Sequence, residues 1–253
     1  MKLTKTIHSN FKSQETLLDD CIENFDTKGK AFGNQERNSL KLFDINNREV
    51  NIKSFRIPNI INQIAYKFFR KSKAQRSYEF ANKLLEFGIG TPKPIAYYEY
   101  TSPFLFKKSY YLSEQLNCDL TYRELTRDLD YSDHENIVSA FTQFTFKLHE
   151  KNILFLDHSP GNTLIRKTEA GYDFFLVDLN RMSFKPLSFE DRIKNFERLT
   201  THKSIVKTMS DAYAKCSGED ADTIFNLMWK STQEFQEKFH RKKRLKKKLK
   251  FWK

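Results

Sequence analysis

The stretch that decides the fold runs from residue 153 to residue 182 and reads ILFLDHSPGNTLIRKTEAGYDFFLVDLNRM. Two apolar, strand-like runs each end at a carboxylate, Asp157 after the first and Asp178 after the second, and Asn162 follows five residues after Asp157. Gly171 lies in the polar segment between the runs and fits a hairpin connection. A hairpin would bring these two acids and the amide to one end, where they would make a site for a divalent metal and phosphate.

The spacing D-x-x-x-x-N, followed by an aspartate at a strand end, is the catalytic half of the protein-kinase signature. The wording LDHSPGNTL and LVDLNR resembles the Kdo/WaaP (InaA-type) lipopolysaccharide kinase family, over roughly residues 20–200. The resemblance implies an α+β, two-lobed, protein-kinase-like fold with a small antiparallel-sheet N-lobe and a mainly helical C-lobe. We expect a polar lead-in (1–19), the N-lobe (20–116), the C-lobe (117–237) and a basic, aromatic tail (238–253).

The expected N-lobe contains an alternating strand, VNIKSF, at residues 50–55, in which Lys53 points away from the apolar side chains. The resemblance implies that Lys53 binds the phosphates of ATP and takes part in catalysis. It also implies a nucleotide-binding glycine loop from Gly29 to Gly33. That spacing departs from G-x-G-x-x-G, and an ordinary turn explains the two glycines equally well.

A helix is predicted over residues 74–87, because Tyr78 and three later apolar residues form a stripe that stops at Gly88. In the kinase pattern a glutamate of this helix orients the strand lysine, and the resemblance implies that Glu79 does so here, with Glu86 in reserve. Two strands are expected after it, over 95–100 and 110–116. The second ends at the hinge that receives adenine, where Glu114 is the expected cofactor-binding position.

The expected C-lobe opens with a capping-box pattern at Ser132 and Glu135, before a helix that leads into the catalytic stretch. The resemblance implies that Asn162 and Asp178 hold Mg2+ and that Asp157 accepts or orients the proton of the attacking hydroxyl. Leu156 replaces the arginine that reads a phosphorylated activation loop in protein kinases. No Ala-Pro-Glu motif and no long activation segment follow, which favours a small or sugar acceptor over a peptide.

The net charge of +12 is concentrated in the tail, where residues 238–253 hold ten Lys or Arg and no acid. Phenylalanine, leucine and tryptophan side chains are interleaved with these charges. A solvated basic end and a nucleic-acid arm are alternatives, and we favour a helix on an anionic membrane surface. Residues 56–77 also mix basic and aromatic side chains. An ordinary exposed face is favoured there over a surface for an anionic acceptor or lipid.

Three widely spaced cysteines indicate no disulfide framework. The first residues lack the apolar core of a signal peptide, and no apolar run is long enough to cross a bilayer. These features favour a cytoplasmic protein, placed peripherally on the inner face of the inner membrane by its tail.

The leading hypothesis is therefore an ATP- and Mg2+-dependent kinase for a lipid-linked sugar acceptor, the Kdo or heptose of the lipopolysaccharide inner core. The alternatives are a kinase of another small-molecule or protein acceptor, a catalytically inactive kinase-like binding module, and a nucleic-acid binder, which only the tail suggests.

Overall fold

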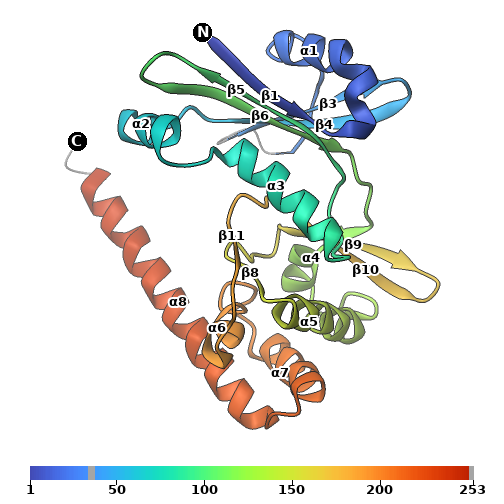
Figure 1. Cartoon of the computed structure of the whole chain (residues 1–253). Coiled ribbons are helices and arrows are strands. Elements are labelled where there is room, and N and C mark those ends of the chain that lie inside the picture. The colour runs from blue at the N-terminus through green and yellow to red at the C-terminus, as the bar shows by residue number, and fades with distance from the viewer. Residues whose placement is uncertain (34–37, 251–253) are drawn as a thin grey trace. The chain divides into compact units, whose positions relative to one another are not determined.

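The computed structural model describes residues 1–33 and 38–250, with the side chains described as far as residue 247. The chain divides into two compact units (Figure 1). Unit 1 contains Met1–Asn117 and Asp178–Arg181, and unit 2 contains Cys118–Val177 and Met182–Lys253. The short segment that starts at Asp178 thus belongs to the N-terminal unit, although the residues on both sides of it belong to the other unit.

Unit 1 is built on an antiparallel sheet with the strand order β1-β5-β6-β4-β3-β2. Its elements are β1 (Lys2–Ile7), the 3-10 helix η1 (Ser9–Gln14), α1 (Glu15–Glu23), β2 (Lys30–Ala31), β3 (Ser39–Ile45), β4 (Arg48–Phe55), α2 (Ile60–Phe68), α3 (Lys73–Glu86), β5 (Pro94–Thr101) and β6 (Phe106–Glu114). This is the antiparallel N-terminal sheet that the sequence predicts.

Strand β4 shows how alternation divides the core of unit 1. Val50 and Ile52 are buried on one face of the sheet, in a cluster that includes Leu18 of α1. Phe55 lies on the opposite face, in a second cluster with Ala74 of α3. Successive side chains of a strand point to opposite faces, so Lys53 shares the α3 face with Phe55.

The first nineteen residues, expected to be only a polar lead-in, are an ordered part of unit 1. Strand β1 pairs with β5 in a register that places Lys2 opposite Thr101. Ile7, Phe11 and Leu18 are buried in the core cluster. Lys5 forms an ion pair with Asp19 at 2.6 Å. Backbone pairing at the sheet edge therefore orders a segment whose side chains are mostly exposed.

Helix α3 matches the predicted span closely. The Ser72 hydroxyl accepts a hydrogen bond from the Gln75 backbone N–H at 3.0 Å, which caps the first turn. Ala74, Ser77, Ala81 and Leu84 are buried. Gly88, at φ +67°, takes up the left-handed conformation that commonly follows a helix end.

Unit 2 is mainly helical, with small antiparallel sheets. Its elements are β7 (Leu120–Thr121), α4 (Tyr122–Arg127), α5 (His134–Glu150), β8 (Ile153–Phe155), β9 (Thr163–Thr168), β10 (Gly171–Leu176), β11 (Met182–Phe184), α6 (Phe189–Lys194), α7 (Lys203–Ser217) and α8 (Ala221–Lys250). Strands β9 and β10 form a hairpin at the expected Gly171 connection, with Gly171 opposite Thr168, whereas the apolar run before Asp157 is β8, which pairs with β11. Helices α5, α7 and α8 share one hydrophobic core, which is centred on Phe141, Val206 and Met228.

The start of α5 differs from the predicted capping box. The N-cap residue is Asp133, at φ +63°, and no side chain caps the helix there. The Asp133 carboxylate instead accepts hydrogen bonds from Asn136 and from the Tyr172 hydroxyl. A capping box does form one helix earlier, between Thr121 and Glu124.

The basic tail continues helix α8. Residues 237–247 are all exposed, including Phe239 and Leu245. Within the described residues, no helix is both long enough and apolar enough to span a membrane.

Candidate active site

The structure brings together Lys53 and Asp178, which lie far apart in the sequence. The Lys53 ammonium donates to Asp178 Oδ1 at 2.7 Å. Only 14% of the Lys53 side chain and 32% of the Asp178 side chain is exposed. The expected roles of the two residues, phosphate binding by Lys53 and cation binding by Asp178, are compatible with this pairing and stay a prediction.

Asp178 is held in an unusual backbone conformation. Its φ of +60° is left-handed, which aspartate tolerates better than most residues. The Asn180 amide donates to the same Oδ1 atom at 2.7 Å. Two donors therefore converge on one carboxylate oxygen, and the short segment 178–181 is anchored to the sheet of unit 1.

Glu79 lies on α3 as expected, but its partners differ from the expected one. It accepts hydrogen bonds from Lys71 at 2.8 Å and from Gln75 at 3.0 Å. Two α3 residues belong to the cluster beside Lys53, namely Ala74 and Tyr78, and Tyr78 packs with Tyr97. One residue corresponds to about 100° around a helix, so Glu79 points away from that cluster. Glu86, the reserve choice, is exposed at the end of α3.

The two glycines assigned to a nucleotide loop flank strand β2. Gly29, at φ +80°, precedes the strand and lies against the Phe43 ring, which a Cβ atom would approach to 2.5 Å. Gly33, at φ +65°, follows the strand, at the start of the connection to β3. Most of that connection, residues 34–37, lies outside the described residues. Gly29 therefore has a packing reason to be glycine, and a role of either glycine in nucleotide binding stays a prediction.

The expected hinge position, Glu114, ends strand β6. Its backbone N–H donates to the Lys93 carbonyl at 2.9 Å, and its carboxylate binds Arg48 at 2.9 Å. The next backbone N–H, that of Gln115, donates to the Glu49 carbonyl at 2.9 Å. Both donors already have partners, so any contact of these two residues with adenine would use other groups.

In unit 2, Asp157 lies in the loop between β8 and β9. Its Oδ1 atom accepts a hydrogen bond from the Arg198 guanidinium at 2.8 Å. The same Arg198 nitrogen lies 3.2 Å from the Leu156 carbonyl oxygen, to which it also donates. Arg198 thus fixes both the side chain of Asp157 and the backbone before it. Sequence reasoning missed this residue, because it lies 41 positions away and belongs to no motif.

Asn162 braces the same loop. Its side-chain amide donates to the Asp157 carbonyl at 2.8 Å, which closes the five-residue turn. Its own carbonyl accepts a hydrogen bond from the Val177 N–H at 3.0 Å. Asp178 follows Val177 directly, so the end of β10 is tied to the loop that carries Asp157 and Asn162.

Gly161 is the point where this loop meets α4. A Cβ atom there would lie 2.2 Å from an Arg123 guanidinium nitrogen. The absence of a side chain therefore lets Arg123 pack against the loop backbone. Arg123 is a second basic residue beside the loop that no sequence motif indicated.

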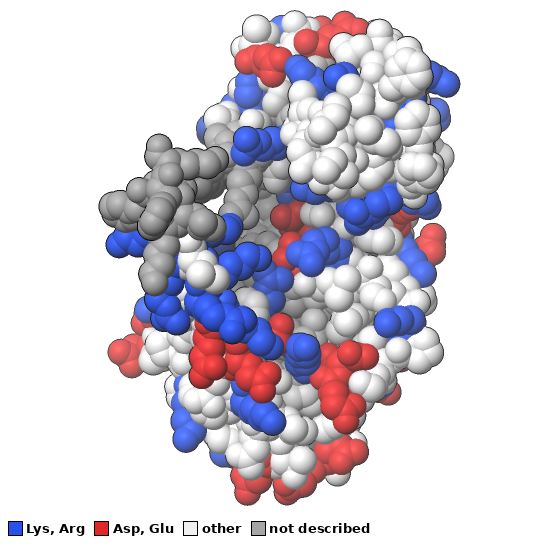
Figure 2. Space-filling view, turned by 90° about the vertical axis from the view of Figure 1, so that its left-hand side faces the viewer, with Lys and Arg blue, Asp and Glu red and all other residues white. Residues whose placement is uncertain are grey.

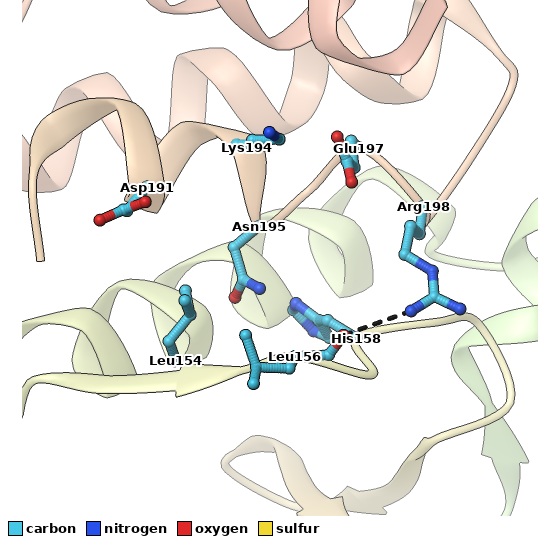
Figure 3. A pocket seen from close by; sticks show the side chains of 8 residues that line it. All are labelled: Leu154, Leu156, His158, Asp191, Lys194, Asn195, Glu197 and Arg198. Carbon is cyan, nitrogen blue, oxygen red and sulfur yellow. Dashed lines mark hydrogen bonds between the residues drawn. The ribbon is translucent and has the colours of Figure 1, made fainter. Parts of the chain in front are cut away.

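A pocket of about 240 Å³ adjoins the loop that carries Asp157 (Figure 3). Leu156, His158, Asn195 and Arg198 line it, together with side chains from α6 and its end. In Figure 3 the dashed line joins Arg198 to the loop backbone. The pocket gives Arg198 a solvent-facing side, while its guanidinium binds the loop.

Two buried histidines support this region without carrying charge. Burial lowers the pKa of His149 to about 4, and its ring lies between the Tyr213 hydroxyl and Asn195. Burial lowers the pKa of His158 to about 3, and its ring packs among Phe141 and neighbouring aromatic rings. Both are neutral at pH 7, so we assign them a structural role.

The two residues expected to hold Mg2+ each carry a suitable ligand atom. Asp178 supplies a carboxylate and Asn162 an amide oxygen, the hard ligands that magnesium binds. Magnesium keeps several waters and phosphate oxygens in nucleotide sites, so few protein ligands are needed. No group of three or more His, Cys, Asp or Glu side chains gathers into a metal cluster within the described residues. The fit therefore depends on a nucleotide that brings its own phosphate ligands.

An antiparallel sheet with a lysine on an inner strand, an aspartate bound to that lysine, and a helical unit with a D-x-x-x-x-N loop define a kinase-like α+β protein. A family model described as the lipopolysaccharide kinase (Kdo/WaaP) family matches residues 26–222. The chain therefore belongs to the lipopolysaccharide kinase (Kdo/WaaP) family, as its motifs predicted.

The fold comparison agrees with this assignment. A solved structure described as "WaaP in complex with acyl carrier protein" is similar to this chain with a TM-score of 0.64. The match covers 94% of this chain and 99% of that one, at 15% sequence identity. It confirms the expected kinase-like fold. No curated protein sequence matches the chain.

Proposed function

We propose that the protein is an ATP-dependent kinase that phosphorylates a sugar hydroxyl of the lipopolysaccharide inner core, on Kdo or heptose. The observation that carries this proposal is the ion pair of Lys53 with Asp178 at 2.7 Å. The Lys53 side chain is mostly buried, and its acidic partner follows a strand that is distant in the sequence. An ion pair that only stabilises the surface would not need this arrangement. It is the arrangement that binds and orients a nucleoside triphosphate.

Each of the predicted site residues then has a role in the reaction. Lys53 binds the phosphates of ATP, and Asp178 and Asn162 hold Mg2+. When bound, the metal neutralises charge on the phosphates. Asp157 orients the acceptor hydroxyl or accepts its proton, while Arg198 fixes the direction of its carboxylate. Phosphoryl transfer depends mainly on such positioning and charge stabilisation.

The chain after Asp178 supports an acceptor that is not a peptide. Residues 179–188 separate Asp178 from helix α6, and within them β11 pairs directly with β8. This leaves no room for a long peptide-docking segment. Leu156, 43% exposed, stands where protein kinases have the arginine that reads a phosphorylated loop. We therefore expect no control of this protein by phosphorylation of an activation loop.

The composition of the tail supports binding of the protein to a membrane surface. Each exposed basic residue of α8 would contribute about 1 kcal/mol of binding free energy near an anionic leaflet. Phe239, 52% exposed, suits the interface with the headgroups. We propose a cytoplasmic enzyme held peripherally on the inner leaflet, where a lipid-linked sugar acceptor would be available.

The test is transfer of phosphate from ATP to a purified lipid A–Kdo acceptor, with and without heptose, followed by mass spectrometry of the acceptor. The parent should add one phosphate, and Asp157→Ala should not. Asp173→Ala, which alters an exposed acid on β10, is the matched control and should keep full activity. ATP binding without a phosphorylated lipid would favour a kinase of another acceptor.

One observation favours the catalytically inactive alternative, namely that Gly29 and Gly33 lie on opposite sides of β2. A binding module without catalysis would show no transfer to any acceptor. If Mg-ATP also failed to raise the melting temperature, nucleotide binding itself would be refuted.

A further inference from the structure

Helix α2 carries its apolar side chains on the outside of unit 1. Ile60, Ile61, Ile64 and Phe68 are 55%, 74%, 42% and 55% exposed. Phe69, directly after the helix, is 80% exposed. No residue of α2 is buried. This is a contiguous apolar surface and not a set of scattered side chains, which is the kind of patch that marks an interaction site.

The apolar face of α2 points to solvent, and its more polar face points to the sheet. At about 100° per residue, the three isoleucines and Phe68 fall within one arc of the helix. The opposite side packs on the sheet through more polar side chains. The Tyr66 ring, on that side, contacts Phe106 of β6 at 5.6 Å between centroids. Lys67, at the edge of the apolar arc, donates to the Thr101 hydroxyl at 3.1 Å. A core helix would do the opposite.

The surroundings of this face are positively charged. Residues 50–78 contain no Asp or Glu. Arg56 precedes α2 in the sequence, Arg70 and Lys73 follow it, and all three are exposed; the Arg70 guanidinium lies over the Tyr66 ring at 5.7 Å. Figure 2, which looks onto the side of the molecule on which Figure 1 draws α2, shows a largely uncharged surface bordered by Lys and Arg and by some Asp and Glu.

We propose that α2 is a membrane-docking helix, which inserts its isoleucine and phenylalanine side chains into the interface of an anionic bilayer while the flanking cations bind lipid phosphates. An exposed apolar arc with a basic border is the pattern of interfacial helices. The side chains of this arc and Phe69 are between 42% and 80% exposed, so they are accessible from outside, which suits insertion into a bilayer. The proposed docking site consists of α2 residues and does not include the C-terminal tail. It does not depend on kinase activity.

The experiment places a tryptophan reporter on the helix. Ile61→Trp and the control Leu17→Trp, on the exposed face of α1, are mixed as full-length proteins with phosphatidylethanolamine–phosphatidylglycerol vesicles that contain brominated lipid. Relative to the parent, whose own two tryptophans set the background, Ile61→Trp should gain a quenched component and Leu17→Trp should not. Equal quenching in the two variants, or none in either, would overturn the proposal.

A second measurement uses loss of binding. Ile61→Ser with Phe68→Ser should weaken flotation with anionic vesicles by roughly tenfold or more, because each buried apolar side chain contributes substantially. Leu17→Ser should leave flotation unchanged, and all variants should melt at the parent temperature, since the altered side chains are exposed. Unchanged flotation would refute docking through α2. A dimer that the double variant dissolves, or retention only on an acidic protein, would also refute it, by identifying a different occupant.

Discussion

Replacing Arg198 by glutamine should lower kcat about 10- to 30-fold without changing the KM for ATP. The guanidinium binds the Asp157 carboxylate at 2.8 Å and the Leu156 carbonyl at 3.2 Å, and 31% of the Arg198 side chain is exposed. A charge-assisted hydrogen bond contributes about 1.5–3 kcal/mol. Partial exposure favours the lower end of this range, and about 1.5–2 kcal/mol of lost positioning corresponds to that loss of rate.

The assay is steady-state transfer to the lipid acceptor, with kcat and both KM values determined separately. Arg198→Lys should recover part of the rate, because it keeps the charge but not the two-contact geometry. Arg192→Gln, which breaks the Arg192–Glu150 pair on α6, is the matched control and should keep the parent kcat. A folded Arg198→Gln protein within twofold of the parent kcat, or an equal loss in the control, would refute the positioning role.

Three further outcomes follow from the structure. Burial lowers the pKa values of His149 and His158 to about 4 and about 3. Only the unfolded chain takes up these protons as the pH falls below the ordinary histidine value, so each should cost about 2 kcal/mol of unfolding free energy between pH 7 and pH 5. Urea titrations at both pH values measure this, and a stability independent of pH in His149→Gln and parent alike would contradict it. Gly29→Ala should lose about 1–3 kcal/mol in the same assay at pH 7, because φ is +80° and the added Cβ meets Phe43, whereas a neutral effect would show that the ring moves aside. Deletion of residues 238–253 should reduce vesicle binding but spare turnover of a deacylated, soluble acceptor, and loss of both would argue against a pure anchoring role.

Much of the fold could be predicted because its signals are local. The alternation around Lys53 and the apolar stripe of α3 gave the correct elements, and Asp157, Asn162 and Asp178 gave the family. Strand β1 gave no such signal, because only Ile7 of its six residues is buried. Its pairing with β5 uses the backbone, which every sequence shares.

The remaining differences come from tertiary contacts. Ser132 and Glu135 have the spacing of a capping box, but the Asp133 interactions with Asn136 and Tyr172 shift the start of α5. Arg198 binds Asp157 from a segment that carries no motif. Such contacts join residues distant in sequence, so no pattern within a single segment predicts them.

In the proposed function Lys53 binds the phosphates of a nucleotide, and Asp178 holds the magnesium ion that accompanies them. Calorimetric titration of the full-length chain with Mg-ATP tests it most directly, with Lys53→Met compared with Lys108→Met, whose ammonium pairs with Asp26 on the surface of the same unit. Loss of a charge-assisted contact to phosphate should weaken binding roughly 10- to 100-fold in Lys53→Met, and Lys108→Met should bind like the parent. Equal affinity in the parent and both variants would contradict the account.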